Sequence, residues 1–510
     1  MQRLTGEAVG YGTMTSRREF LALGAAVASS LAACGRNGMA TDELIELSAT
    51  AAVAAMRGGD ISAETYARAL LARCERYAFL NAFITLQPDR VLEAAVAADR
   101  LRASGAATGM LHGLPIPVKD SVNTHDLPTT AGTRALSAFY PPDDAEIVRI
   151  LRRAGGLVLG KTNIHELSWG WTSNNGAFGP VRNPYDPERI PGGSSGGTAA
   201  AIAARLAPLG VAEDTQGSIR VPAALCGIYG FRPTTGRYPN EGVAPITPLF
   251  DQVGPHARRV EDLQLFDAVI TGEPALQEAS LDGVRIGVSP EFYFAELDGD
   301  VARIAAAALD DLRAAGAVLV EADVPGLAEL VSLTTAQIQL YEVMPRLTDY
   351  LALYEAGIGF DELLAQASPD IRANFEAYVL RNGPHAVSEQ DFVAARDVHL
   401  PALRQTLRDY FAGQNVAAMA FPATQIPAPP IGQDTEVELN GRTVLLETVI
   451  SRNISPGSTA GLPGLVVPVG LTAGNLPIAL EFDSPAGSDR NLLSLGRAVE
   501  RLFGQLPVPP

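Results

Sequence analysis

Two glycine-flanked serines and one lysine are the residues of this sequence best suited to covalent chemistry. Ser194 lies in the run Gly192-Gly193-Ser194-Ser195-Gly196-Gly197, and Ser218 directly follows another glycine. Glycine gives the backbone conformational freedom and lets it approach a substrate closely. Lys119 directly follows the apolar segment 113–118. Apolar surroundings disfavour the charged ammonium, which lowers the pKa of a lysine toward that of a usable base. These residue types favour acyl transfer by a serine nucleophile with a lysine base.

The segments around these residues resemble the amidase-signature family, whose hallmark is a Ser–cis-Ser–Lys triad. Lys119, Ser194 and Ser218 fall at the spacing of that triad, and the resemblance covers nearly all of residues 41–500. It is closest to amidases of the indoleacetamide and mandelamide hydrolase type. The other segments that carry it are His165-Glu166-Leu167, Ser173-Asn174-Asn175, Arg182-Asn183-Pro184, Arg232-Pro233-Thr234 and Ala460-Gly461-Leu462-Pro463-Gly464.

The resemblance implies a role for each matched residue. Ser218 is the expected nucleophile and forms an acyl-enzyme, while Ser194, after a cis Gly193–Ser194 bond, relays protons to neutral Lys119. An oxyanion hole is expected from the backbone N–H groups of Thr215, Gln216, Gly217 and Ser218. The expected supporting residues are Ser195, Asp214 and Arg220.

The nucleophile loop departs from the family pattern at two positions. Gln216 stands where the family often has glycine, so its side chain can narrow or polarise the pocket while its N–H still donates. Glu213 stands where many members have threonine. It is interpreted either as a buried partner for Arg220 or as a difference of lineage.

Alternating helices and apolar strands predict an α/β protein that positions these residues. The resemblance implies a mixed central β-sheet with helices on both faces, in one large catalytic domain over 41–505. Helices are expected from Thr41 and Ser62 and over 90–104, 143–154, 198–205, 261–270, 300–315 and 388–412. Strands are expected over 81–86, 112–118, 157–159, 209–212, 284–288 and 464–469.

The resemblance implies that the pocket for the acyl group draws on residues 320–460, where family members vary most; the periodic pattern is weakest over 320–450. Tyr341, Met344 and Phe421 are candidate lining residues. Trp169 and Trp171 either line the pocket or pack in the core. The long irregular segment 172–197 is expected to be functional, since a loop of that length is unusual inside a compact domain.

Two short motif matches are rejected on structural grounds. Residues Gly155 to Thr162 fit the phosphate-loop pattern, but a strand-forming Gly-Leu-Val-Leu fills the place of the loop. Residues Gly192 to Gly196 fit the nucleophile elbow of α/β-hydrolases, which needs a preceding strand that the proline-rich 184–191 cannot form. The elbow remains an alternative, with His256, His385 or His399 as its base.

The first 33 residues are interpreted as an export signal. Ser16-Arg17-Arg18-Glu19-Phe20-Leu21 resembles a twin-arginine signal, and the apolar run 21–33 is too short to span a membrane. Leu31-Ala32-Ala33-Cys34 resembles a lipobox, so Cys34 is the expected lipid-bearing N-terminus before a tether over 34–40. Met14 is an alternative start to Met1. A chance arginine pair before an amphipathic helix is the other interpretation. The expected location is periplasmic or cell-surface, with membrane attachment only through Cys34.

Composition limits the partners. Asp and Glu number 57 against 39 Lys and Arg, a net charge of −18 that opposes nucleic-acid binding. The cysteines lack metal-ligand spacing, and His165-Glu166 lacks a second histidine at helical spacing, so neither a metal nor a cofactor is expected. The expected partner is a small-molecule amide, and the chain is expected to be a monomer or a homodimer.

The predicted activity is hydrolysis of a small hydrophobic or aryl carboxamide to a carboxylate and ammonia or an amine. Esters, carbamates and aryl anilides stay open as substrates, because the same triad forms the same acyl-enzyme from each. A transamidase that works with partner subunits on tRNA is poorly matched to an exported acidic chain. A non-catalytic surface lipoprotein that binds small amides is the alternative of another class.

Overall fold

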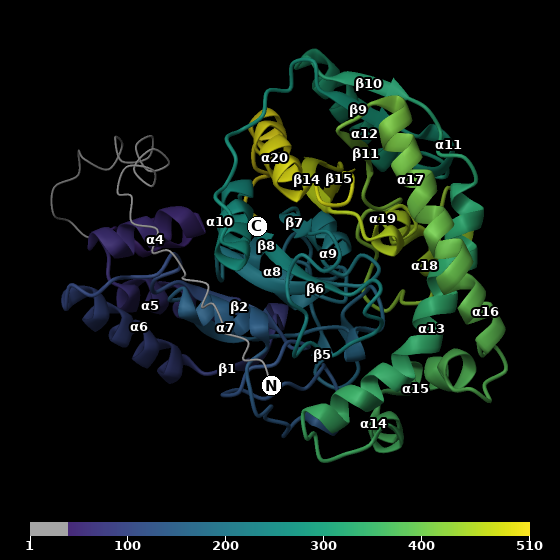
Figure 1. The fold of residues 1–510 in the computed structure, drawn as a ribbon. Coiled ribbons are helices and arrows are strands. Elements are labelled where there is room, and N and C mark those ends of the chain that lie inside the picture. The colour runs from purple at the N-terminus through teal and green to yellow at the C-terminus, as the bar shows by residue number, and fades with distance from the viewer. Residues whose placement is uncertain (1–38) are drawn as a thin grey trace, which may run out of the picture. The chain divides into compact units, whose positions relative to one another are not determined.

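A mixed sheet of eleven strands runs through residues 39–510, the part of the chain that the computed structural model describes (Figure 1). Neighbouring strands are parallel in the groups β3-β2-β6 and β11-β9-β10 and antiparallel elsewhere. In their order across the sheet, the strands are β1 (Phe83–Leu86), β3 (Leu157–Thr162), β2 (Pro115–Lys119), β6 (Leu209–Asp214), β8 (Gln252–Ala257), β7 (Tyr229–Arg232), β14 (Gly464–Leu471), β15 (Pro477–Asp483), β11 (Ala418–Pro422), β9 (Arg285–Val288) and β10 (Val318–Glu321).

Helices cover both faces of this sheet. Successive residues of a strand point to opposite faces, and in β14 a side chain at Gly464 would meet Arg220 of α9 (Arg220–Leu225). The next residue, Leu465, packs against Gly496 of α20 (Asp489–Phe503). α9 and α20 therefore lie on opposite faces. This confirms the predicted α/β fold with a mixed central sheet and covering helices, in one large domain.

Local sequence signals explain where several helices begin. Ser62 caps α5 (Ala63–Arg76), because its hydroxyl accepts a hydrogen bond of 2.9 Å from the N–H of Thr65. Pro88 stands in the first turn of α6 (Pro88–Ala103). Backbone N–H groups there have no acceptor within the helix, so proline, which lacks an N–H, costs no hydrogen bond. The other α-helices outside the 320–450 region are α3 (Thr41–Glu46), α4 (Ala49–Gly58), α7 (Glu146–Arg153), α8 (Gly196–Ala203), α10 (Val260–Thr271), α11 (Pro290–Tyr293), α12 (Gly299–Ala314) and α19 (Ser455–Ala460).

The weakly patterned region 320–450 is largely helical. Its longest element, α13 (Leu327–Leu353), contains Pro345 and buries Glu342, which accepts hydrogen bonds from Thr247 Oγ1 at 2.5 Å and Arg346 at 2.8 Å. A proline and a core-facing carboxylate both run against an amphipathic helix pattern. The remaining elements there are α14 (Phe360–Gln366), α15 (Pro369–Asn374), a π-helical turn (Phe375–Val379), α16 (Glu389–Ala394), a second π-helical turn (Ala395–His399), α17 (Leu400–Gln414), the hairpin β12 (Glu436–Leu439) and β13 (Arg442–Leu445), and α18 (Glu447–Ile450).

The structure supports the rejection of both short motifs. The segment from Gly155 runs directly into β3, and Lys161 is buried there beside Asp120 Oδ1 at 3.2 Å. No strand precedes Ser194 over 181–193. Within 172–197 the regular structure before α8 is one short hairpin, β4 (Asn174–Asn175) with β5 (Gly179–Pro180).

The predicted signal segment, residues 1–33, and Cys34 lie outside the described residues. Of the predicted 34–40 tether, only residues 39 and 40 are described. Among residues 39–510, no helix combines the length and apolar character that a membrane span requires.

Candidate active site

The site lies where two parallel strands end side by side. β2 ends at Lys119 and its parallel neighbour β6 ends at Asp214, so their carboxyl ends share one edge of the sheet. α8 packs against both strands and begins directly after Ser194 and Ser195. This edge is where open α/β sheets commonly bind ligands.

Lys119 contacts Ser194 as the resemblance implied. Lys119 Nζ donates a hydrogen bond of 2.7 Å to Ser194 Oγ, and both side chains are fully buried. Burial lowers the pKa of Lys119, and the nearby carboxylates of Glu213, Asp214 and Asp251 offset part of that effect. A lysine whose pKa is lowered and whose amine touches a serine hydroxyl can accept a proton from it.

The backbone around Ser194 is enclosed by neighbouring chain. The Gly193–Ser194 peptide bond is cis. A side chain at Gly193 would meet the backbone of Trp171 and Thr172 within 3 Å, so only glycine fits there. Ser194 carbonyl oxygen accepts hydrogen bonds from the His165 N–H at 3.1 Å and from Ser173 Oγ at 3.2 Å.

Ser195 is also held in place. Its hydroxyl donates a hydrogen bond of 3.1 Å to the carbonyl oxygen of Glu213. This bond links the segment that carries Ser194 to the end of β6, which suits the supporting role expected for Ser195.

Ser218 lies in the tight turn between β6 and α9. It lines the pocket described below, and its hydroxyl makes no hydrogen bond within residues 39–510. Gly217 takes φ +105°, a conformation that favours glycine. Ser218 thus lines the pocket, and no hydrogen bond joins its hydroxyl to Ser194.

Gly217 does not have the free N–H expected of an oxyanion-hole donor. Its N–H donates a hydrogen bond of 2.8 Å to Asp214 Oδ1, and the Ile219 N–H donates one of 3.0 Å to Asp214 Oδ2. The sequence assigned all four N–H groups from Thr215 to Ser218 to the hole, and this assignment is wrong for Gly217. The carboxylate of Asp214 uses its lone pairs to shape the turn instead.

Asp214 and Arg220 form the centre of a buried ionic cluster beneath this turn. Arg220 contacts Asp214 at 3.1 Å and Glu481 at 2.5 Å, and Arg232 Nε lies 3.5 Å from Asp214. Burial by itself raises the pKa of Asp214, but the two guanidinium groups outweigh it and hold the pKa at about 2. These contacts join the turn to the sheet, and the supporting role of Asp214 and Arg220 stays a prediction.

Glu213 pairs with Lys119, whereas the sequence offered Arg220 as its partner. Glu213 Oε1 lies 2.5 Å from Lys119 Nζ, and the carboxylate is buried. Arg220 is occupied by Asp214 and Glu481. This contact could not be predicted, because it needs β2 and β6 to be neighbours, which a single sequence does not reveal.

A pocket of about 570 Å³ opens in front of Ser218. Trp169, Trp171 and Gln216 line it together with residues from the segments 336–340, 370–378 and 434–447. Residues from 320–460 thus line this pocket, as do both tryptophans, and its role as the acyl pocket stays a prediction. Trp169 also packs edge-on against Phe375 in the core.

The three specific guesses at lining residues are wrong. Phe421 is fully buried and stacks on Tyr293, because it lies on β11, which has a neighbouring strand on each side. Tyr341 stacks on Phe392, and Met344 packs in a core cluster. Which residues of α13 and of the sheet reach the pocket could not be read without the three-dimensional arrangement.

The mouth of the pocket is acidic. Asp370, Asp434 and Glu447 line it and are exposed, while no Lys or Arg is among the lining residues of the described chain. Deeper inside, His165 is buried, which lowers the pKa of its imidazole. The pocket thus combines aromatic walls, a neutral interior and a negative rim.

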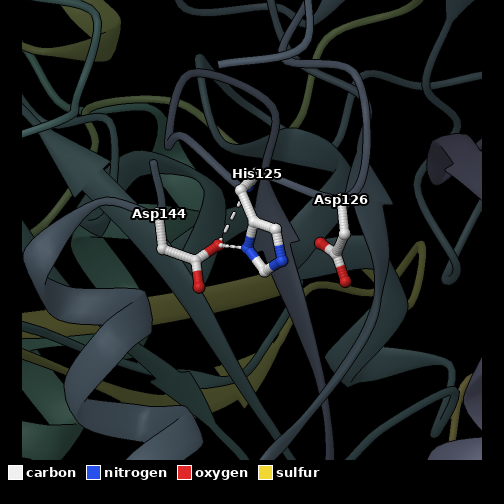
Figure 2. Close-up of side chains that lie close together, drawn as sticks. All are labelled: His125, Asp126 and Asp144. Carbon is white, nitrogen blue, oxygen red and sulfur yellow. Dashed lines mark hydrogen bonds and ion pairs between the residues drawn. The ribbon is translucent and has the colours of Figure 1, made fainter. Parts of the chain in front are cut away.

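One cluster elsewhere has the side-chain types of a metal centre. His125, Asp126 and Asp144 lie close together, and Figure 2 shows His125 Nδ1 facing Asp144. The distance from His125 Nδ1 to Asp144 Oδ1 is 3.0 Å. Arginines already bind both carboxylates: Arg152 contacts Asp126 at 2.6 Å and Asp144 at 3.0 Å, and Arg90 contacts Asp126 at 2.9 Å. The two arginines already neutralise the carboxylates that would otherwise attract a metal ion. The contacts therefore favour a structural role for this cluster as a set of ion pairs.

Known proteins share this architecture and sequence over most of the chain. The family model described as Amidase matches residues 66–493. An indoleacetamide hydrolase of Agrobacterium vitis is 40% identical over 448 residues, 88% of this chain and 95% of that protein. A mandelamide hydrolase of Pseudomonas putida is 35% identical over 483 residues, 92% of this chain and 94% of that protein.

The fold comparison agrees with the sequence comparison. A crystal structure described as an amidase superposes with a TM-score of 0.81 at 31% identity, covering 90% of this chain and all of that one. Family model, relatives and fold together cover the strands, turn and pocket described above. The chain therefore belongs to the amidase family and is a carboxamide hydrolase.

Proposed function

We propose that this enzyme cleaves small neutral aryl or hydrophobic amides through an acyl-enzyme on Ser218, with Ser194 and Lys119 as the proton relay. The observation that carries the proposal is the buried 2.7 Å hydrogen bond between Lys119 Nζ and Ser194 Oγ, next to a pocket that Ser218 lines. The contact suits a lysine that works as the neutral amine, since burial lowers its pKa.

In the proposed reaction Ser218 Oγ attacks the carbonyl carbon of the amide. Its proton passes to Ser194 Oγ while the proton of Ser194 passes to Lys119 Nζ. The negative oxygen of the tetrahedral intermediate is stabilised by the backbone N–H groups of Thr215, Gln216 and Ser218. When the C–N bond breaks, the leaving amine receives its proton from Ser194, which Lys119 reprotonates. Water then releases the carboxylate from Ser218 by the same relay.

The substrate proposal follows from the pocket and from the relatives. Trp169 and Trp171 offer flat apolar surface to an aromatic acyl group. The acidic rim of Asp370, Asp434 and Glu447 disfavours an anionic substrate. The names of the relatives, indoleacetamide and mandelamide hydrolase, describe neutral arylacetamide-type substrates.

A hydrolysis screen tests this function. Indoleacetamide, mandelamide, aryl anilides, peptide amides, esters and carbamates are compared at equal concentration with the wild-type enzyme and with Ser218→Ala. Arylacetamides are expected among the best substrates. Ser218→Ala is expected to lower kcat by about 10⁴-fold or more, and Lys119→Ala by a similar factor.

Ser195→Ala is the matched control for these variants. It removes a neighbouring hydroxyl whose bond goes to the Glu213 carbonyl, so a loss of only about tenfold is expected. Activity of Ser218→Ala or Lys119→Ala at the level of Ser195→Ala would contradict the proposed roles.

We also propose that the chain is exported and lipidated at Cys34, on the basis of its twin-arginine and lipobox motifs. Replacing Arg17 and Arg18 by lysine is expected to keep the protein unprocessed in the cytoplasm. Mass spectrometry of the membrane fraction is expected to find a mature N-terminus at Cys34 carrying lipid. A soluble cytoplasmic protein that retains residues 15–33 would contradict the proposal.

A further inference from the structure

Lys119 Nζ bridges two acceptors, the hydroxyl of Ser194 and the carboxylate of Glu213. The distance to Ser194 Oγ is 2.7 Å and the distance to Glu213 Oε1 is 2.5 Å. Ser121 Oγ lies 3.4 Å from the same carboxylate oxygen. Glu213 is thus joined to the proton relay at the end remote from the pocket.

Both partners of this pair are inaccessible to solvent. The side chain of Lys119 is 0% exposed and that of Glu213 is 5% exposed. Water can neither screen the pair nor replace one partner, so the charge state of Lys119 depends on the carboxylate of Glu213. Removing the carboxylate therefore changes the proton affinity of the lysine directly.

The other ionisable groups around Lys119 act more weakly or are already balanced. Asp214 raises the pKa of Lys119 less than Glu213 does, and Asp214 is itself paired with Arg220 and Arg232. Asp251 also raises the pKa of Lys119, but its carboxylate is hydrogen-bonded to Thr215 and to backbone N–H groups.

Two histidines complete the surroundings of the lysine. Burial lowers the pKa of His165, and it lowers that of His256 to about 4, so both are neutral near pH 7. Their rings add no positive charge there that could compete with Lys119. Glu213 is the ionisable group in contact with Lys119 Nζ within the described chain.

We propose that Glu213 is a positioning residue that holds Lys119 Nζ against Ser194 and sets its proton affinity. The inference rests on the proposed function, since it requires Lys119 to be the base. During attack the amine takes the proton of Ser194, and during amine release it returns that proton, so the pair ends each acylation with the protons it held at the start.

The carboxylate of Glu213 favours the charged form of Lys119, so removing the carboxylate lowers the pKa of Lys119. Glu213→Gln keeps the size and an acceptor oxygen but removes the charge, and the pKa of Lys119 falls. The base form then persists to lower pH. The acidic limb of the kcat/KM–pH profile is expected to move by at least about one unit toward acid. The plateau at high pH is expected to fall, because a weaker base accepts the proton less readily.

The experiment compares kcat/KM between about pH 5 and pH 10 for the wild-type enzyme, Glu213→Gln, Glu213→Asp and Glu500→Gln. Glu500 is a buried carboxylate of α20 outside the pocket, so Glu500→Gln is the matched control and its acidic limb is expected to stay in place. Glu213→Asp keeps the charge, so its limb is expected between those of the wild-type enzyme and Glu213→Gln. If Glu213→Gln does not fold, Glu213→Thr removes the same charge and is expected to give the same shift.

A folded Glu213→Gln or Glu213→Thr enzyme whose acidic limb coincides with that of the wild type would overturn the inference. If activity fell by the same factor at every pH while the acidic limb stayed in place, the role of Glu213 would be structural. Failure of the proposed function has a different signature. In that case Lys119→Ala would keep substantial activity and the wild-type acidic limb, whatever the behaviour of the Glu213 variants.

Discussion

The indole N–H of Trp171 donates a hydrogen bond of 3.0 Å to the carbonyl oxygen of Gln216. It ties an aromatic wall of the pocket to the turn that carries Ser218. The side chain of Gln216 is held on its other side by Thr459, to which its amide donates at 3.2 Å. The turn is therefore fixed from the pocket and from α19, which keeps its N–H groups in position before a substrate arrives.

Trp171→Phe is expected to lower kcat by about 5- to 10-fold, because it keeps an aromatic wall but removes one hydrogen bond to the turn. Trp169→Phe is the matched control, since the indole of Trp169 bonds to Asn374 at 2.8 Å and not to the turn. The control is expected to affect KM more than kcat. Steady-state kinetics with one arylacetamide measure both, and equal losses of kcat in the two variants would contradict the role of the Trp171 bond.

Arg220→Met is expected to destabilise the fold by about 3–5 kcal/mol, because it removes the guanidinium that both buried carboxyl groups, Asp214 and Glu481, contact. Urea denaturation followed by circular dichroism measures the loss. Arg303→Met is the control, since Arg303 pairs with Asp300 at the surface, and its effect is expected to stay within about 0.5 kcal/mol. A similar small effect of Arg220→Met would show that the cluster is dispensable.

Asp251 is expected to make stability depend on pH near neutrality. Burial raises its pKa from 3.8 to about 7, despite a hydrogen bond of 2.6 Å from Thr215 Oγ1. A pKa that is higher in the folded state gives a contribution that is complete below about pH 4 and is lost as the pH rises through about 7. We subtract the unfolding free energy of Asp251→Asn from that of the wild type. Between about pH 4 and pH 7 this difference should fall by up to about 1.4 kcal/mol per pH unit.

Urea titrations of both proteins at several pH values between about 5 and 8 measure this difference. A difference that is constant or that rises with pH would contradict the raised pKa of Asp251.

The acidic rim predicts discrimination by substrate charge. An arylacetamide with a ring carboxylate is expected to have a kcat/KM at least about tenfold below that of its neutral ring-carboxamide counterpart at low salt. Asp370→Asn should narrow the gap, and so should salt, because the rim is exposed and its field is screened. Asp310→Asn, on the surface of α12, is the control. Equal rates for the two amides would contradict this account of the rim.

The contact between Lys119 and Ser194 could be predicted from sequence, because it depends on short segments with rigid requirements. The glycines around Ser194 and Ser218 and the apolar strand before Lys119 can each be read locally. The rejection of the phosphate-loop match also followed from local physics, since Gly155 to Thr162 had to continue into a strand.

The features that the sequence did not predict depend on which elements are neighbours in the fold. The contact between Glu213 and Lys119 exists because β2 and β6 are adjacent and parallel. The role of the Gly217 N–H depended on how Asp214 turns back toward it. The pocket walls from 336–340 and 434–447 meet the tryptophans only in the folded chain. Relationships of this kind are set by packing, and the order of residues does not specify them.

The most direct test of the central claim is to identify the residue that carries the acyl group. The enzyme is mixed with an aryl ester, quenched in acid within its first turnovers, digested and sequenced by mass spectrometry. The acyl mass is expected on Ser218 and is expected to be absent from the same peptide of Ser218→Ala. An acyl group on Ser194 or Ser195, or an unmodified enzyme that still shows a burst of product, would contradict the account.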